Sequence, residues 1–300
     1  QSHLGWRDTV FMSKQTWSAE KARALLRLLD DDSPMVASAV SEQLKAFPEE
    51  GDAFLREVAK GADSDLAIRA LALMEELGWS DGVEDFLGFI RSLKYELETG
   101  WLLLDRTVHP TCDASVCHLF LDEMAERCRQ LMIPPITPRE TCKLLNRVFF
   151  HEYGFRGAAK ESHHPDNSFL HKVIEQRRGL PITLSVLYLL VARRIGFDLE
   201  PIGLPGRFMV GCFAEDVPFY VDVWAGGHLR EIDELQDFLD RISVEDSASF
   251  LLPVTVAETL SRGCRNLILQ FRREGDEKRS KLFHSFLREF EKALRSEANA

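Results

Sequence analysis

Side chains that could act as nucleophiles gather around an apolar helix predicted at residues 182–195 of this 300-residue chain. Thr183 and Ser185 offer hydroxyl groups near the start of that helix, and Cys212 offers a thiol in a later strand-like segment. Each would need a general base, and no histidine lies nearby in the sequence. Backbone hydrogen bonding for the hydroxyls and burial for the thiol are therefore the simpler interpretations.

The elements that would position these side chains follow from the apolar pattern. The helix at 182–195 is apolar nearly all the way round, which is typical of a helix at the centre of a domain, and Gly196 ends it. A shorter helix is expected before it, at about 169–177. The segments after it predict, in order, three strands, one helix and a pair of amphipathic helices, at 199–204, 208–213, 219–223, 232–239, 254–272 and 277–296.

The region from residue 19 to residue 148 carries helical periodicity with hardly a strand signal. Helices are expected at about 20–29, 35–44, 66–77, 82–95, 97–106, 115–132 and 138–152. Two similar helix starts, Asp32-Ser33-Pro34 and Asp63-Ser64-Asp65, lie 31 residues apart. Short helices restarted at such an interval suggest stacked pairs of the HEAT or armadillo kind.

These patterns predict an α+β fold class with four segments. We expect an N-terminal extension at 1–18, an all-α helical-repeat-like domain at 19–148, an α+β core at 149–253 and a C-terminal helical hairpin at 254–300.

The composition restricts the classes of partner. The net charge is −11, so the chain as a whole repels nucleic acid and anionic membranes, and no apolar run is long enough to span a bilayer. Six cysteines are too few for a disulfide scaffold and are typical of reduced thiols in the cytoplasm. The chain begins without Met or a signal-peptide core, which indicates a processed chain. We expect a cytoplasmic protein that binds neither nucleic acid nor membrane.

Several runs in the middle of the chain resemble one known family. They are Arg178 to Tyr188 (RGLPITLSVLY), Ala192 to Gly196 (ARRIG), Gly203 to Phe208 (GLPGRF) and Tyr220 to Asp222 (YVD). They are similar to the transglutaminase-like, or papain-like, core, and in particular to the bacterial SirB-type family. The likeness extends over about 97–296, whereas the first 95 residues match only as helical repeat.

The resemblance implies a Cys–His–Asp triad, with the Cys at the N-terminus of the central helix. Carried over to this chain, the Cys position falls on Pro181, the His position on Arg207 and the Asp position on Asp222. Proline has no nucleophilic atom, and arginine stays protonated and cannot act as a base. We therefore expect no catalytic residues here and a protein that is not an enzyme of this class.

The remaining polar groups predict a binding site, for which the candidate residues are Arg207, Asp222, Thr183 and Arg178. A helix N-terminus beside an arginine suits a carboxylate or a phosphate. In the alternative interpretation, Arg207 and Asp222 pair with each other and fill the former cleft.

The expected role is non-catalytic binding of a protein, a peptide or a small anion, without a cofactor. The alternative function is a hydrolase or acyltransferase with a relocated nucleophile, namely Thr183, Ser185 or Cys212, in the same cleft.

A second group of residues has the chemistry of metal ligands: His109, Cys112, Cys117 and His118. It lacks the paired Cys-x₂-Cys spacing of a structural zinc site. Cys117 and His118 are also adjacent at the start of a predicted helix, where their side chains diverge. No metal is expected.

Overall fold

The computed structural model describes residues 17–31, 33–79, 82–158, 164–243 and 247–298. The chain divides into two compact units, residues 1–80 and residues 81–300. The described residues form many helices and two small sheets, so the predicted α+β class is confirmed. Most of the predicted N-terminal extension, 1–16, lies outside the described residues.

The first unit contains four helices: α1 (Ala19–Leu28), α2 (Pro34–Lys45), α3 (Pro48–Ala59) and α4 (Ser64–Glu76). The Asp63 side chain caps α4, and Pro34 occupies the first turn of α2, as the helix-start patterns predict. The sequence did not predict α3. A separate hydrophobic core, which includes Leu44, Leu55 and Trp79, holds these helices together. Their relation as structural repeats stays a prediction.

The second unit begins with four helices: α5 (Val83–Ser92), α6 (Leu97–Arg106), α7 (Ala114–Leu131) and α8 (Pro138–Asn146). The predicted helix at 138–152 continues past α8 as a π-helical turn, Arg147–Glu152. Side chains of α5 to α8 share one hydrophobic core with the α+β part and with the C-terminal helices. Residues 83–148 therefore lie in one compact unit with that part, whereas the predicted segments grouped them with residues 19–82.

The main sheet has four antiparallel strands in sequential order: β3 (Glu200–Ile202), β4 (Met209–Cys212), β5 (Phe219–Asp222) and β6 (His228–Glu231). The three predicted strands are present, and β6 is an additional strand that pairs with β5 from Phe219 opposite Glu231 to Asp222 opposite His228. Helix α11 (Ile232–Arg241) follows β6 directly. A short parallel pair, β1 (Arg156–Gly157) and β2 (Arg178–Gly179), lies before the central helix.

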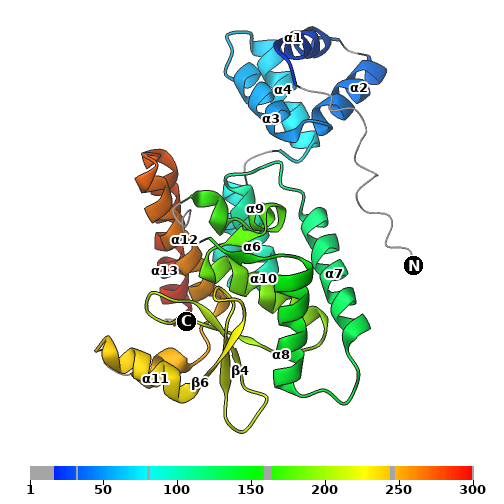
Figure 1. The fold of residues 1–300 in the computed structure, drawn as a ribbon. Helices are drawn as coiled ribbons and strands as arrows, with labels where there is room; N and C mark the ends of the chain where they lie inside the picture. The colour runs from blue at the N-terminus through cyan, green and yellow to red at the C-terminus, as the bar shows by residue number, and fades with distance from the viewer. Residues whose placement is uncertain (1–16, 32, 80–81, 159–163, 244–246, 299–300) are drawn as a thin grey trace, which may run out of the picture. The chain divides into compact units, whose positions relative to one another are not determined.

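Helix α10 (Pro181–Arg194) occupies the centre of the second unit (Figure 1). Every residue from Ile182 to Ala192 is buried, which agrees with a helix that is apolar on all sides. The Tyr188 hydroxyl donates to the side-chain oxygen of Asn146, whose amide donates in turn to the Gly227 carbonyl. This chain of hydrogen bonds ties α10 to α8 and to the turn between β5 and β6.

Three further short elements complete the second unit. Helix α9 (Leu170–Gln176) precedes β2, and two 3₁₀ turns cover Pro165–Ser168 and Ser247–Leu251.

The C-terminal helices α12 (Val256–Arg273) and α13 (Glu277–Ala298) pack side by side as the predicted hairpin (Figure 1). Phe271 stacks on Phe283 across this hairpin. None of the described helices is both long and apolar enough to cross a bilayer.

Candidate functional site

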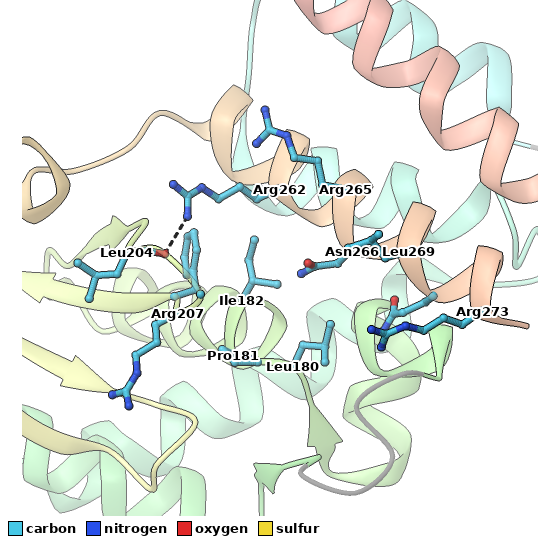
Figure 2. A pocket seen from close by; sticks show the side chains of 13 residues that line it. Leu180, Pro181, Ile182, Leu204, Arg207, Arg262, Arg265, Asn266, Leu269 and Arg273 are labelled. Carbon is cyan, nitrogen blue, oxygen red and sulfur yellow. Dashed lines mark hydrogen bonds between the residues drawn. The ribbon is translucent and has the colours of Figure 1, made fainter. Parts of the chain in front are cut away.

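The start of α10 borders a pocket of about 410 Å³ (Figure 2). Pro181 is the first residue of the helix, where its missing N–H costs nothing. No side chain caps this end of the helix, and Leu180, Pro181 and Ile182 all line the pocket. The partial positive charge of a helix N-terminus therefore lies at the pocket wall.

Arginines dominate the polar lining of this pocket. One is Arg207, which lies in the loop between β3 and β4. The other three belong to α12 and are Arg262, Arg265 and Arg273. The amides Asn266 and Gln270 add hydrogen-bonding groups, and the remaining lining residues are apolar or glycine: Leu180, Pro181, Ile182, Leu204, Gly206, Phe208 and Leu269. None of the described lining residues is acidic, although the chain as a whole carries a charge of −11.

One face of α12 supplies this lining. Arg262, Asn266, Leu269 and Arg273 recur at intervals of three and four residues, which places them on one side of a helix. In Figure 2 the Asn266 side chain points from α12 toward Ile182, whereas Arg265 extends away from α10. Gln270 is held in place because its oxygen accepts from the Ser168 hydroxyl at 2.7 Å and its amide donates to the His164 carbonyl at 3.1 Å.

Arg262 fixes the wall between the pocket and the sheet. Its Nη2 donates to the Gly203 carbonyl at 2.8 Å, and its Nη1 donates to the Leu204 carbonyl at 3.2 Å. Its Nε donates to Glu258, which also accepts from Arg265 at 2.9 Å. Three hydrogen bonds thus commit the Arg262 guanidinium to the loop between β3 and β4 and to its own helix.

Arg207 turns toward the sheet at the other end of the pocket (Figure 2). Its Nη1 lies 3.6 Å from Oδ2 of Asp222, and its guanidinium lies 5.0 Å from the ring centre of Phe238. Asp222 is buried, and its Oδ1 accepts from the Ala225 amide at 3.1 Å. The pairing that the sequence offered as a plug is therefore present, but the space beside Pro181 is a pocket and is not filled by it.

The three positions carried over from the resemblance lie near one another. Pro181 and Arg207 both line the pocket, and Asp222 lies outside the lining but contacts Arg207. The start of α10, the loop before β4 and the end of β5 hold these three residues, and their assignment to the positions of a triad stays a prediction. Residues 117–265 match the family model described as Transglutaminase-like superfamily.

This part of the chain is similar to transglutaminase-like domains. A UPF0162 protein of Xylella fastidiosa (strain 9a5c) is 31% identical over 140 residues, which are 45% of this chain and 48% of that protein. A UPF0162 protein of Vibrio cholerae is 24% identical over 132 residues, 44% of this chain and 49% of that protein. F-box only protein 21 of Mus musculus is 28% identical over 139 residues, 44% of this chain and 22% of that protein.

The chain spans about half the length of the UPF0162 proteins that it matches. No solved structure matches it. The matches support the expected resemblance at the level of the transglutaminase-like superfamily, and the finer SirB-type assignment stays an expectation. The matched range runs from the first turns of α7 into α12, so it contains the sheet, α10 and Arg262, whereas Arg273 lies beyond it.

The candidate nucleophiles of the transglutaminase-like domain do not reach the pocket. Thr183 is fully buried and its hydroxyl finds no hydrogen-bond partner in the described part of the chain, while the Ser185 hydroxyl lies 3.5 Å from the Phe208 carbonyl. Cys212 is fully buried, and burial raises the pKa of its thiol. None of the described lining residues is a Cys, Ser, Thr or His. The groups that nucleophilic catalysis needs are therefore absent from the described lining of this pocket.

The basic pair before α10 also lies outside the pocket lining. Arg178 is exposed on β2. Arg177 packs its guanidinium 4.2 Å from the ring centre of Phe120, and burial lowers the pKa of Arg177. The structure therefore places Arg207 at the pocket and Asp222 against Arg207, but it does not bring Arg178 or Thr183 to the lining.

The arginines of α12 were not among the residues that the sequence pattern marked as candidates for the site. The amphipathic helix was predicted, but its basic residues were not connected with the start of α10, about 80 residues earlier in the chain. A usable signal was present in the spacing of Arg262, Asn266 and Arg273, which marks a basic and polar stripe on one helix face.

Proposed function

We propose that this chain is a non-catalytic transglutaminase-like protein that binds an anionic group in the pocket beside Pro181. The group is a carboxylate or a phosphate, carried by a small molecule or by a protein or peptide partner. The single observation that carries the proposal is the lining, which contains four arginines and no described acidic residue in a chain of net charge −11.

The four arginines differ in how firmly their side chains are held and in how far they are exposed. Arg262 is committed to backbone carbonyls and Arg207 lies near Asp222, so these two mainly set the shape and potential of the pocket. Arg265 exposes about half of its side chain and makes its contact with Glu258 through one nitrogen, Nη1. Arg273 is also exposed. A guanidinium binds a carboxylate or phosphate through two parallel hydrogen bonds. We therefore assign direct contact with the ligand to Arg273, and to Arg265 once its long side chain turns from Glu258 toward α10.

The size of the pocket supports a ligand of several heavy atoms. A volume of about 410 Å³ lies in the range of small-molecule sites, roughly 300–1,000 Å³. Leu180, Ile182 and Leu269 provide apolar surface next to the charged groups. An anionic head with an attached apolar part, such as an acidic side chain or a chain terminus, would use both kinds of surface.

The alternative function, a hydrolase or acyltransferase with a relocated nucleophile, has less support. Thr183, Ser185 and Cys212 are fully buried and lie outside the pocket lining. A nucleophile needs a substrate and a base within hydrogen-bond reach. Broad electrophiles should therefore label none of these three residues in the folded protein.

Thermal unfolding in the presence of inorganic phosphate and of citrate tests the proposal. A ligand at 100 times its Kd stabilises by about 2.7 kcal/mol, which for a unit of this size raises Tm by roughly 5–10 °C. Arg265→Ala and Arg273→Ala should each weaken binding by roughly 10- to 100-fold, since each removes a charge-assisted hydrogen bond. Arg241→Ala is the matched control, because Arg241 lies on α11 outside the pocket lining.

A short poly-glutamate peptide provides the second arm of the test. Tighter binding of the peptide than of either small anion, with the same dependence on Arg265 and Arg273, would identify an acidic segment as the ligand. The proposal would be refuted if Arg241→Ala lost as much binding as Arg265→Ala and Arg273→Ala. It would also be refuted if the anions raised Tm equally in all three variants, because either result would indicate nonspecific screening.

A further inference from the structure

A second cluster of functional side chains lies away from the pocket, where α6 ends and α9 begins. Asp105 is fully buried near the end of α6. Its carboxylate accepts from the Leu170 amide at 3.0 Å and from the His171 amide at 2.8 Å, so it caps the first turn of α9. The Nδ1 atom of His171 lies 2.8 Å from the same carboxylate.

The chain between α6 and α7 brings a thiol to this pair. The His109 amide donates to the Asp105 carbonyl at 2.9 Å, and the Cys112 amide donates to the His109 carbonyl at 3.0 Å. These two turns fold the connection back on the end of α6. A carboxylate oxygen of Asp105, the sulfur of Cys112 and a ring nitrogen of His171 consequently all lie within 4.8 Å of one another.

A second imidazole at the cluster has an unused nitrogen. The His109 ring packs edge-on against His171, with ring centres 4.6 Å apart, and against Phe169 at 4.7 Å. Its Nε2 is buried and has no hydrogen-bond partner among the described residues, and the Asp166 carboxylate is 3.8 Å away. A buried polar atom without a partner is unfavourable, and coordination of an ion would satisfy it.

We propose that Asp105, Cys112 and His171 bind a divalent transition-metal ion, zinc above all, with His109 as the candidate fourth ligand. Sulfur and imidazole donors select zinc over magnesium or calcium, which require oxygen ligands. Zinc bond lengths of about 2.0–2.3 Å put ligand atoms roughly 3–4 Å apart, so Asp105, Cys112 and His171 need only a small closure. His109 lies outside this group and would have to turn toward it to complete the site.

This site differs from the pattern that the sequence offered. His109 and Cys112 belonged to that pattern, but His118 pairs instead with Glu98, with Nδ1 and a carboxylate oxygen 2.8 Å apart. In the cluster, Asp105 and His171 take the place of His118. Asp105 and His171 are 66 residues apart in the chain, so no local spacing could have revealed them. The expectation of no metal rested on the spacing of the four residues in that pattern and on the divergence of the adjacent Cys117 and His118, and it did not consider Asp105 or His171.

A thiol pair is the competing interpretation of the same residues. The Cys112 thiol is within hydrogen-bonding reach of the Cys117 thiol, which is buried on α7. Metal binding would require Cys112 to lose its proton to solvent and bind as the thiolate. A protein in which the two thiols only contact each other would bind no ion at this place.

Titration of the full chain with Co²⁺, after treatment with a chelator and a reductant, tests the proposal. We expect saturation at one ion per chain, a near-ultraviolet thiolate-to-cobalt charge-transfer band, and loss of the band when Zn²⁺ is added. Cys112→Ala should abolish the band, and His171→Gln should weaken binding by at least tenfold. His109→Gln tests the fourth ligand and leaves the Asp105 cap in place.

His118→Gln is the matched control, since it removes an imidazole that pairs with Glu98 outside the cluster, and it should leave the titration unchanged. Circular dichroism of each variant establishes that it is folded. The absence of the band in the folded wild-type protein would overturn the proposal, as would a band that survives in Cys112→Ala. Arg265→Ala should bind Co²⁺ normally, which separates this result from the anion pocket.

Discussion

The Arg262 guanidinium donates to the Gly203 carbonyl at 2.8 Å, and a side chain at position 203 would occupy the same space. An added Cβ would lie 2.6 Å from the Arg262 guanidinium carbon. The absence of a side chain at Gly203 is thus what lets α12 approach the loop between β3 and β4. This contact sets the distance between the arginine stripe of α12 and the start of α10.

Gly203→Ala should therefore displace Arg262 and change the pocket. The flexible guanidinium can move aside, but it would lose its hydrogen bonds to the Gly203 and Leu204 carbonyls. We therefore expect a loss of about 1–3 kcal/mol of stability, together with weaker anion binding. Denaturant unfolding and phosphate titration measure the two effects. Gly88→Ala on α5 is the control, because its Cβ would meet no atom within 4 Å and alanine favours a helix. If both substitutions had the same effect, Arg262 would not be the cause.

The pairing of Arg207 with Asp222 should contribute little to stability. The two charges are 3.6 Å apart, and about half of the Arg207 side chain is exposed, so solvent screens the interaction. A double-mutant cycle with Arg207→Ala and Asp222→Asn should give a coupling energy below about 1 kcal/mol. A coupling of about 2 kcal/mol or more would instead support the plug interpretation for this end of the pocket.

Restoration of the missing triad groups tests the positions that the resemblance implies. Pro181→Cys places a thiol at the N-terminus of α10, where the helix dipole favours the thiolate. Adding Arg207→His supplies an imidazole beside Asp222. If the histidine reaches the thiol, the pKa of the thiol should fall further. Alkylation by iodoacetamide at pH 7 should then become about tenfold faster than in Pro181→Cys alone.

The control for this comparison is Pro181→Cys combined with Arg207→Gln, which removes the guanidinium without supplying a base. Equal alkylation rates in the histidine and glutamine variants would contradict the assignment of Arg207 to the histidine position.

His109 should make the protein sensitive to acid. Burial, and then the charges of His171, Lys172 and Arg279, lower the pKa of His109 from 6.5 to about 3, while Asp166 lies 3.8 Å away. Between these values the unfolded chain binds a proton that the folded chain does not, so stability falls as the pH falls from 6.5 toward 3. The contribution is at most about 5 kcal/mol, and unfolding measured with a chelator present separates it from metal binding.

His109→Phe should remove this part of the pH dependence while keeping the ring contacts with Phe169 and His171. The stability of the wild type should therefore fall relative to that of the variant as the pH decreases from 6.5 toward 3. Parallel stability curves over the same range would show that folding does not lower the pKa of His109.

Local sequence patterns were sufficient to predict most of the helices and the central strands. Pro181 and Gly196 mark the two ends of α10, and its continuous apolar surface predicts burial, because hydrophobic pattern and end signals act within a few residues. Strand β6, which the sequence did not predict, is mostly polar and partly exposed. It forms because β5 offers backbone partners from Phe219 to Asp222. Pairing of that kind depends on the neighbouring strand rather than on propensity.

The amino-acid sequence by itself determined that proline and arginine occupy the positions where the resemblance implies Cys and His, because the chemistry of a side chain is independent of the fold. Only the tertiary structure decided which charges meet. It brought Arg262, Arg265 and Arg273 of α12 to the start of α10, and it brought His171 to Asp105. These contacts join distant segments through packing of the shared hydrophobic core, which no local spacing encodes.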